Sequence, residues 1–139
     1  MKKKMKKVYE DEDTQSEKKE TQMLLEKMAG STIDFKELLI LTNNVDEKIR
    51  LKAIQRLCPC QIKDEVDMFW ERIFQAADDP CPKVRYQSLH NMCDGCPPEW
   101  ESKVAEALEK FNRDPDKDIK RTAHKVLASY LRTGKWNIL

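Results

Sequence analysis

Residues 79–93, DPCPKVRYQSLHNMC, align without a gap with residues 114–128, DPDKDIKRTAHKVLA, at an offset of 35 positions. A third segment, residues 44–58 with the sequence NVDEKIRLKAIQRLC, matches both at the same offset. Each segment carries an apolar residue, a small residue four positions later and a second apolar residue four positions after that. This spacing places the side chains on one face of an α-helix, so each segment predicts a helix with a buried face. The matching positions are Ile49, Val84 and Ile119, then Ala53, Ser88 and Ala123, then Leu57, Met92 and Leu127.

The sequence before each of these segments repeats in the same register. Leu38, Ile73 and Leu108 share one position, and Phe35, Trp70 and Ala105 share another. Each unit is therefore predicted to be a helix, a short turn and a second helix, which makes the fold all-α. We expect helices over residues 64–77, 81–93, 99–112 and 116–132. Six residues are predicted to be largely buried, namely Val84, Leu89, Met92, Ile119, Val126 and Leu127.

Two Asp-Pro pairs mark the turns between the helices of the second and third units. Pro lacks an N–H group and disfavours the helical conformation of the residue before it, so Asp79-Pro80 and Asp114-Pro115 end the first helix of each unit. An acidic residue ahead of the next helix can accept its free N–H groups and complement its dipole.

The string DP-x-x-x-VR-x-x-A-x-x-x-L resembles the second helix of HEAT repeats, most closely the short repeats of phycobilisome-lyase-like proteins. The resemblance covers roughly residues 31–130. It implies a right-handed α-α superhelix, or solenoid, of about three HEAT-like helix pairs with an extra N-terminal helix. It also implies a ladder of acidic and basic side chains between neighbouring units. At the matching positions stand Asp79 with Arg85, Asp114 with Lys120, and Asn44 with Arg50, so the acid is missing from the first pair and the third has Lys for Arg.

The two ends of the chain differ from the repeats. Residues 1–20 hold lysines and acids with one strong apolar pair, Val8-Tyr9, and are predicted to form a disordered charged tail. Residues 21–134 form the HEAT-like region, and its first helix, around Met23 to Met28, is expected to end at Gly30.

Residues 135–139 include the large apolar residues Trp136, Ile138 and Leu139, an unusual composition for a free tail. We expect them to fold back after Gly134 and cap the last helix pair. The alternative is a linear motif that docks on another chain.

Length and composition limit the class of protein. The chain has 139 residues and a formal net charge of +1, and it contains neither an apolar run of membrane-spanning length nor a secretory signal. These features predict an intracellular protein, cytoplasmic or nuclear, without membrane association, and in such a protein the five cysteines are expected to stay reduced. Oligomeric state is left open.

The cysteines and histidines are the residues most able to form a chemical site. Cys58, Cys60, Cys93 and Cys96 resemble a zinc ligand set, but Cys58 and Cys93 are repeat-equivalent and therefore lie about one helix-packing distance apart, too far for one ion. We expect less than one zinc per chain and a buried Cys93. His124 shares its position with Leu89 and is expected in or near the core. No catalytic residue, metal site or cofactor is predicted, and the chain is not expected to be an enzyme.

Charge divides between the two helices of each unit. The second-helix segments sum to +6 and the first-helix segments to −5. In HEAT-like stacks the second helices line the concave side, so the resemblance implies a basic concave surface. It would bind an acidic segment of another protein; alternatives are nucleic acid, bound through its phosphates, or a surface that is only solvated. The candidate partner-binding residues are Lys52, Arg56, Lys83, His90, Arg121, Lys125 and Arg132, with Gln87 and Asn91 between them, and Tyr86 is the one aromatic residue placed nearby.

Overall fold

A computed structural model describes residues 12–57 and 66–136 of the chain, and within these ranges the protein is all-helical, without a strand. The predicted all-α class is therefore confirmed. The first-helix and second-helix segments of all three units form helices, with α4 described from Val66 onward. The elements are α1 (Glu12–Ala29), α2 (Phe35–Leu41), α3 (Glu47–Arg56), α4 (Val66–Ala76), α5 (Pro82–Cys93), the short 3-10 helix η2 (Pro98–Trp100), α6 (Glu101–Phe111) and α7 (Lys117–Thr133).

The helix boundaries repeat with the same offset as the sequence. Helices α3, α5 and α7 begin at Glu47, Pro82 and Lys117, each 35 residues after the one before. Helices α2, α4 and α6 end at Leu41, Ala76 and Phe111, again 35 residues apart. The local cause is similar in each unit, because a capping or helix-initiating residue stands at the same place.

The starts of the second helices show this local chemistry. The Asp46 carboxylate accepts the N–H of Lys48 at the start of α3, and the Asp116 carboxylate accepts the N–H groups of Asp118 and Ile119 at the start of α7. In α5 the equivalent Cys81 makes no such bond, and Pro82 occupies the first helical position instead. Pro is suited there because its missing N–H would have had no helical partner.

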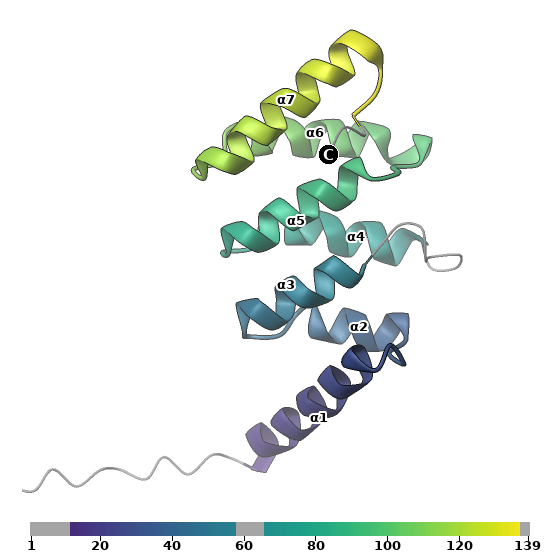
Figure 1. Cartoon of the computed structure of the whole chain (residues 1–139), viewed down its shortest axis with the longest axis vertical. Coiled ribbons are helices and arrows are strands. Elements are labelled where there is room, and N and C mark those ends of the chain that lie inside the picture. Colours follow the sequence, from purple (N-terminus) through teal and green to yellow (C-terminus); the bar gives the residue numbers. More distant parts are fainter. Residues whose placement is uncertain (1–11, 58–65, 137–139) are drawn as a thin grey trace, which may run out of the picture.

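The helices form an elongated stack of two layers, seen in Figure 1 with α3, α5 and α7 in front and α2, α4 and α6 behind them. Helix α3 packs against α5, and α5 against α7, so the second helices contact each other along the stack. Each also packs against the first helix of its own unit. Helix α1 lies at one end and contacts α2.

The core lies between the two layers. The small residues Ala53, Ser88 and Ala123 are fully buried, which allows the helices to approach closely. Of the six residues predicted to be buried, five are confirmed, and Leu127 is half-buried. The prediction for His124 is wrong: it is exposed, whereas Leu89 at the same repeat position is fully buried. No described helix follows α7 to cover that position.

Helix α1 is longer than the sequence suggested. The predicted tail boundary at residue 20 is corrected, because the helix begins at Glu12, while residues 1–11 lie outside the described residues. Its buried residues, Leu24 and Met28, belong to the C-terminal half. Propagating an existing helix costs far less than starting one, so this anchored half extends into a segment rich in Glu, Lys and Gln.

Aromatic residues pack the α4–α6 side of the stack. Trp70 is fully buried, as its phase with Phe35 predicted. Trp100 stacks on it with ring centroids 6.3 Å apart and also lies 5.9 Å from the ring of Phe74. The ammonium of Lys103 lies over the Trp100 ring at 4.6 Å, which is within the range of a cation–π contact.

The chain reverses after α7. Gly134 ends the helix in the left-handed conformation, with φ 73°, and its N–H donates to the carbonyl of Tyr130. Trp136 is buried and stacks on the Tyr130 ring at 4.4 Å. The hydroxyl of Ser129 donates to the carbonyl of Lys135 and holds the reversal. Ile138 and Leu139, which the fold-back prediction included, lie outside the described residues.

Candidate functional site

Two arginines connect successive helix pairs. Arg50 in α3 donates from Nε and Nη2 to the two carboxylate oxygens of Asp79, at 2.9 and 3.0 Å. Arg85 in α5 binds Asp114 in the same way, at 2.9 and 3.1 Å. Both ion pairs are largely shielded from solvent, with side-chain exposures of 13% and 6% in the first and 14% and 8% in the second. The hydrogen bonds to these carboxylates raise the pKa of each arginine.

Each arginine also holds the loop at the start of its own helix. The Nη1 group of Arg50 donates to the carbonyl of Asn44, and that of Arg85 donates to the carbonyl of Asp79. The second acid is fixed in turn, because Asp114 accepts the N–H of Asp116. The ladder therefore runs from one unit to the next: the acid that pairs with an arginine stands 29 residues after it, not six before.

The two ends of the ladder explain the departures from the repeat pattern. Asn44 stands where the later units have Asp, and its amide donates to the hydroxyl of Thr21 in α1 at 3.5 Å. Since α1 offers no arginine here, a neutral side chain suffices. Lys120 stands where the earlier units have Arg, and it is exposed, with no ion pair to another residue of the described ranges.

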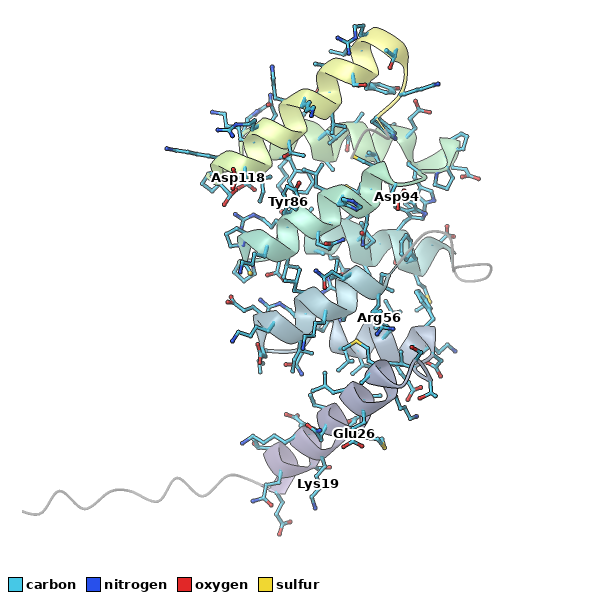
Figure 2. All side chains as sticks on the ribbon, in the orientation of Figure 1. Lys19, Glu26, Arg56, Tyr86, Asp94 and Asp118 are labelled. Atoms are coloured by element: carbon cyan, nitrogen blue, oxygen red, sulfur yellow. The ribbon has the colours of Figure 1, made fainter. Side chains whose placement is uncertain are left out.

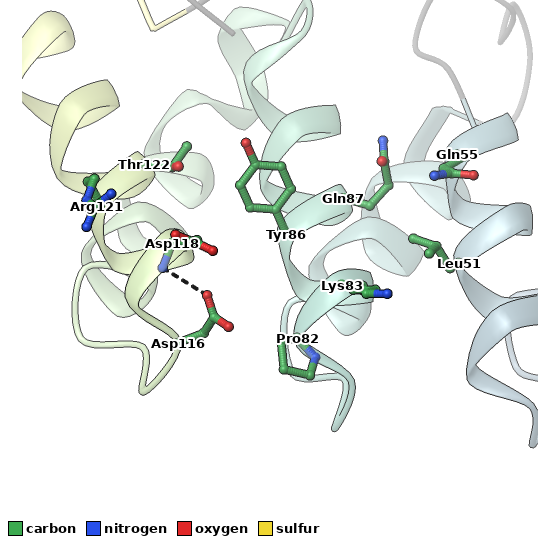
Figure 3. A pocket seen from close by; sticks show the side chains of 10 residues that line it. All are labelled: Leu51, Gln55, Pro82, Lys83, Tyr86, Gln87, Asp116, Asp118, Arg121 and Thr122. Carbon is green, nitrogen blue, oxygen red and sulfur yellow. Dashed lines mark hydrogen bonds between the residues drawn. The ribbon is translucent and has the colours of Figure 1, made fainter.

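A groove of about 550 Å³ crosses the second helices α3, α5 and α7. Figure 3 shows the Tyr86 ring projecting from α5 into the space between α5 and α7. Tyr86 is 38% exposed, so part of its ring is free to contact a bound molecule. The lining residues are Leu51 and Gln55 from α3, Pro82, Lys83, Tyr86 and Gln87 from α5, and Asp116, Asp118, Arg121 and Thr122 at the start of α7.

The groove is built from equivalent positions of the repeat. Leu51, Tyr86 and Arg121 are 35 residues apart and lie on the same face of three successive helices. Lys83 and Asp118 form another equivalent pair. The groove-facing positions are thus regular in place and varied in chemistry.

The charges of the groove are mixed. Two of the predicted basic residues, Lys83 and Arg121, line it together with the carboxylates of Asp116 and Asp118. Figure 2 shows Asp118 close to Tyr86 on the front of the stack. The Asp116 carboxylate is already occupied by two backbone N–H groups of α7. The expectation of a surface lined by basic residues therefore has to be corrected at this point.

The other predicted basic residues lie outside the groove lining. Lys52 is exposed on α3, and Lys125 and Arg132 are exposed on α7. Lys125 and Arg132 follow Arg121 by 4 and 11 residues, so the three side chains lie along one exposed side of α7. His90 is half-buried at the position equivalent to Lys125.

Arg56 and Asn91 do not belong to the groove face. Asn91 was predicted to lie on the basic surface, but it is buried, and its amide donates to the carbonyls of Ile54 and Leu57 at 2.9 and 3.0 Å. From α5 it thereby provides hydrogen-bond donors for two carbonyl groups at the C-terminal end of α3. Arg56 is the equivalent residue of α3 and is exposed; Figure 2 labels it.

The sequence reasoning missed the acidic residues and the amide at the groove. Asp118 is the repeat equivalent of the predicted residue Lys83, and Gln55 is the repeat equivalent of the predicted residue His90. The repeat therefore contained the signal for both.

Two of the four cysteines that resemble a zinc ligand set, Cys93 and Cys96, lie within the described residues. Cys93 is buried, as predicted, and burial raises the pKa of its thiol to about 12. Burial also raises the pKa of the Cys96 thiol to about 11, and this thiol donates to the carbonyl of Pro97. Burial thus favours the neutral thiol form of both residues. Cys58 and Cys60 lie outside the described residues.

Within residues 12–57 and 66–136 no cluster of three His, Cys, Asp or Glu side chains is placed to hold a metal ion. The helices of these ranges are also too short or too polar to cross a lipid bilayer. Comparisons of the chain with protein families, with curated proteins and with solved structures give no match.

Proposed function

We propose that this chain is a HEAT-like solenoid, a right-handed superhelix of three helix pairs preceded by one extra helix. It acts without catalysis, as an interaction module for another protein. The proposal is supported by the 35-residue offset of the helix boundaries and by the two bidentate arginine–aspartate pairs between units. A ladder of this kind fixes the units against one another, so that the second helices form a rigid surface.

The observation that carries the proposed function is the groove across α3, α5 and α7. It has a partly exposed tyrosine at its centre and amide and charged groups around it. Partly exposed tyrosines are frequent anchors in protein interfaces because they combine a large apolar area with few rotatable bonds. An extended segment lying across the three helices would contact equivalent positions of all three units.

The bound segment is acidic and contacts Lys83 and Arg121, with the exposed side of α7 continuing the basic surface through Lys125 and Arg132. Nucleic acid fits less well, since Asp116 and Asp118 would face its phosphates in the same groove. A protein segment can avoid these carboxylates by its choice of side chains, whereas a phosphate backbone cannot.

A pull-down with the full chain, with and without nuclease, tests this proposal. We expect the captured protein to survive nuclease treatment and to be lost with Tyr86→Ala and with Arg121→Glu. Lys19→Glu, an exposed charge reversal on α1, is the matched control and should leave binding unchanged. Loss of binding after nuclease treatment would instead support the nucleic-acid alternative. Binding that ignores both groove substitutions would contradict the proposal.

A further inference from the structure

The open side of α7 presents the positions through which each earlier second helix contacts the next unit. In α3 and α5 these positions hold Arg50 and Arg85, which bind a carboxylate of the following unit. They also hold Ile54 and Leu89, which are fully buried. In the inner units this side of the helix is therefore an interface.

The same positions of α7 are uncovered. Lys120 and His124 are exposed, and Leu127 is half-buried where Met92 is fully buried. Leu131, one turn further along the same side, is 82% exposed. Trp136 packs on Tyr130, whose hydroxyl donates to Glu101 of α6, and it leaves Lys120, His124 and Leu131 exposed.

The charge of this side indicates what would cover it. Lys117 and Lys120 are exposed in the first turn of α7, one turn before the exposed His124, while the acid of the same turn, Asp118, lines the groove instead. In both earlier units the ladder position is filled by an aspartate placed just before a second helix. A partner that supplies a carboxylate there, beside an apolar helix face, would reproduce the internal contact.

We propose that the open side of α7 is a second docking surface, which binds a helix–loop segment of another protein as a fourth layer of the stack. The segment carries an Asp or Glu for Lys120 and apolar residues for Leu127 and Leu131. This rests on the proposed function only for the repeat of helix pairs, and it needs nothing from the groove. Histidine in place of Leu89 and lysine in place of Arg85 make the contact weaker than the internal ones, which suits a partner that dissociates.

The test uses the ¹⁵N-labelled full chain and a synthetic peptide of its own residues 98–118 as the probe. That peptide contains the first helix of the third unit and Asp114, the carboxylate that Arg85 binds in the protein. We expect NMR shift changes at Lys120, His124 and Leu131, and none at Tyr86 or Gln87. An Asp114→Asn peptide and the Lys120→Glu protein should each bind about fivefold more weakly, the range of an exposed ion pair.

Two matched variants make the outcome decisive. Lys19→Glu, at the opposite end of the stack, and Tyr86→Ala, in the groove, should leave peptide binding unchanged. No shift at the three α7 residues at millimolar peptide, or binding that ignores both Asp114→Asn and Lys120→Glu, would overturn the second surface and leave the groove proposal standing. Loss of binding with Tyr86→Ala would show that the peptide occupies the groove instead, and would also overturn it.

Discussion

At the scale of single residues, the arginine–aspartate pairs are the most exacting contacts of the described structure. Arg85 makes four hydrogen bonds, two to the Asp114 carboxylate and two to the carbonyls of Asp79 and Pro80. Its removal leaves a shielded carboxylate without its charge partner. A surface ion pair would contribute little, but removing one member of a largely buried pair is costly because the other charge stays desolvated.

We therefore expect Arg85→Ala to lower the free energy of unfolding by about 3 kcal/mol, at the lower end of the range for broken buried pairs. Urea denaturation followed by circular dichroism measures it. The matched control is Lys120→Ala, the same repeat position with an exposed side chain, which should change stability by less than about 0.5 kcal/mol. Equal effects of the two substitutions would contradict the expectation that Arg85 stabilises the fold through its ion pair and that the exposed Lys120 does not.

Ser88 offers a test in the opposite direction. Its hydroxyl is fully buried and has no hydrogen-bond partner among the described residues, and the equivalent positions hold Ala53 and Ala123. Ser88→Ala should therefore stabilise the protein by about 1 kcal/mol, since it removes a desolvated polar group and keeps the small volume. The reciprocal change, Ala53→Ser, should destabilise it. Thermal unfolding of the two variants checks the pair, and a destabilised Ser88→Ala would reveal a hydrogen bond to Ser88.

At the residue scale, the resemblance implied a ladder between neighbouring units, and the pairs Arg50–Asp79 and Arg85–Asp114 agree with it. The six-residue spacing alone does not say which unit supplies the acid for each arginine, because that depends on how the units stack. Asn91 shows the same limit. The equivalent residue Arg56 is exposed, whereas Asn91 in α5 is buried against the C-terminal end of α3, where its amide donates to the carbonyls of Ile54 and Leu57.

At the scale of elements, the repeat predicted the boundaries of α5 and α7 within about a residue, because it contains the residues that start these helices. The capping acids Asp46 and Asp116 stand two repeat lengths apart, and Pro82 begins the helix between them at the equivalent place. Helix α1 was predicted less well. Residues 12–20 have no buried side chain among those described, so no apolar periodicity marks them. Their helix depends on propensity and on continuation from Leu24 and Met28, and composition alone favoured disorder.

The reversal after α7 carries the element-scale prediction. Trp136 is 8% exposed and stacks on Tyr130, whereas Leu131 nearby is 82% exposed. Trp136→Ala should lower the free energy of unfolding by about 3 kcal/mol, the cost of removing a large buried aromatic side chain. Leu131→Ala, as the control, should have little effect on the isolated chain. Differential scanning calorimetry compares them, and an unchanged melting temperature for Trp136→Ala would favour the linear docking motif instead.

At the scale of the whole molecule, each unit contacts its neighbours in the stack and few contacts reach further. Stability in such an arrangement depends on position, because inner units are supported from both sides and the ends from one. Helix α5 lies in the middle of the stack, because it contacts α3, α4, α6 and α7. Helix α1 contacts α2 and is held by Lys27 to Glu37 and by Thr21 to Asn44.

Hydrogen exchange should follow this gradient. We expect the slowest amide exchange in α5 and the fastest among the described helices in residues 12–20 of α1, which have no buried side chain among those described. Mass spectrometry of exchange in the native protein resolves the two regions. Uniform protection along the chain would mean that the stack unfolds in one step and that its ends gain as much support as its centre.

The constant offset between helix starts has a consequence for the length of the chain. Removing residues 79–113 would excise one full repeat and splice Asp78 to Asp114, so that the start of α7 follows α4 in the register that α5 now has. Arg50 would then find Asp114 at the distance along the chain where Asp79 stood. We therefore expect the fold to accept deletion or duplication in steps of 35 residues, whereas a step of any other length between two arginine–aspartate pairs would shift the later pairs out of register.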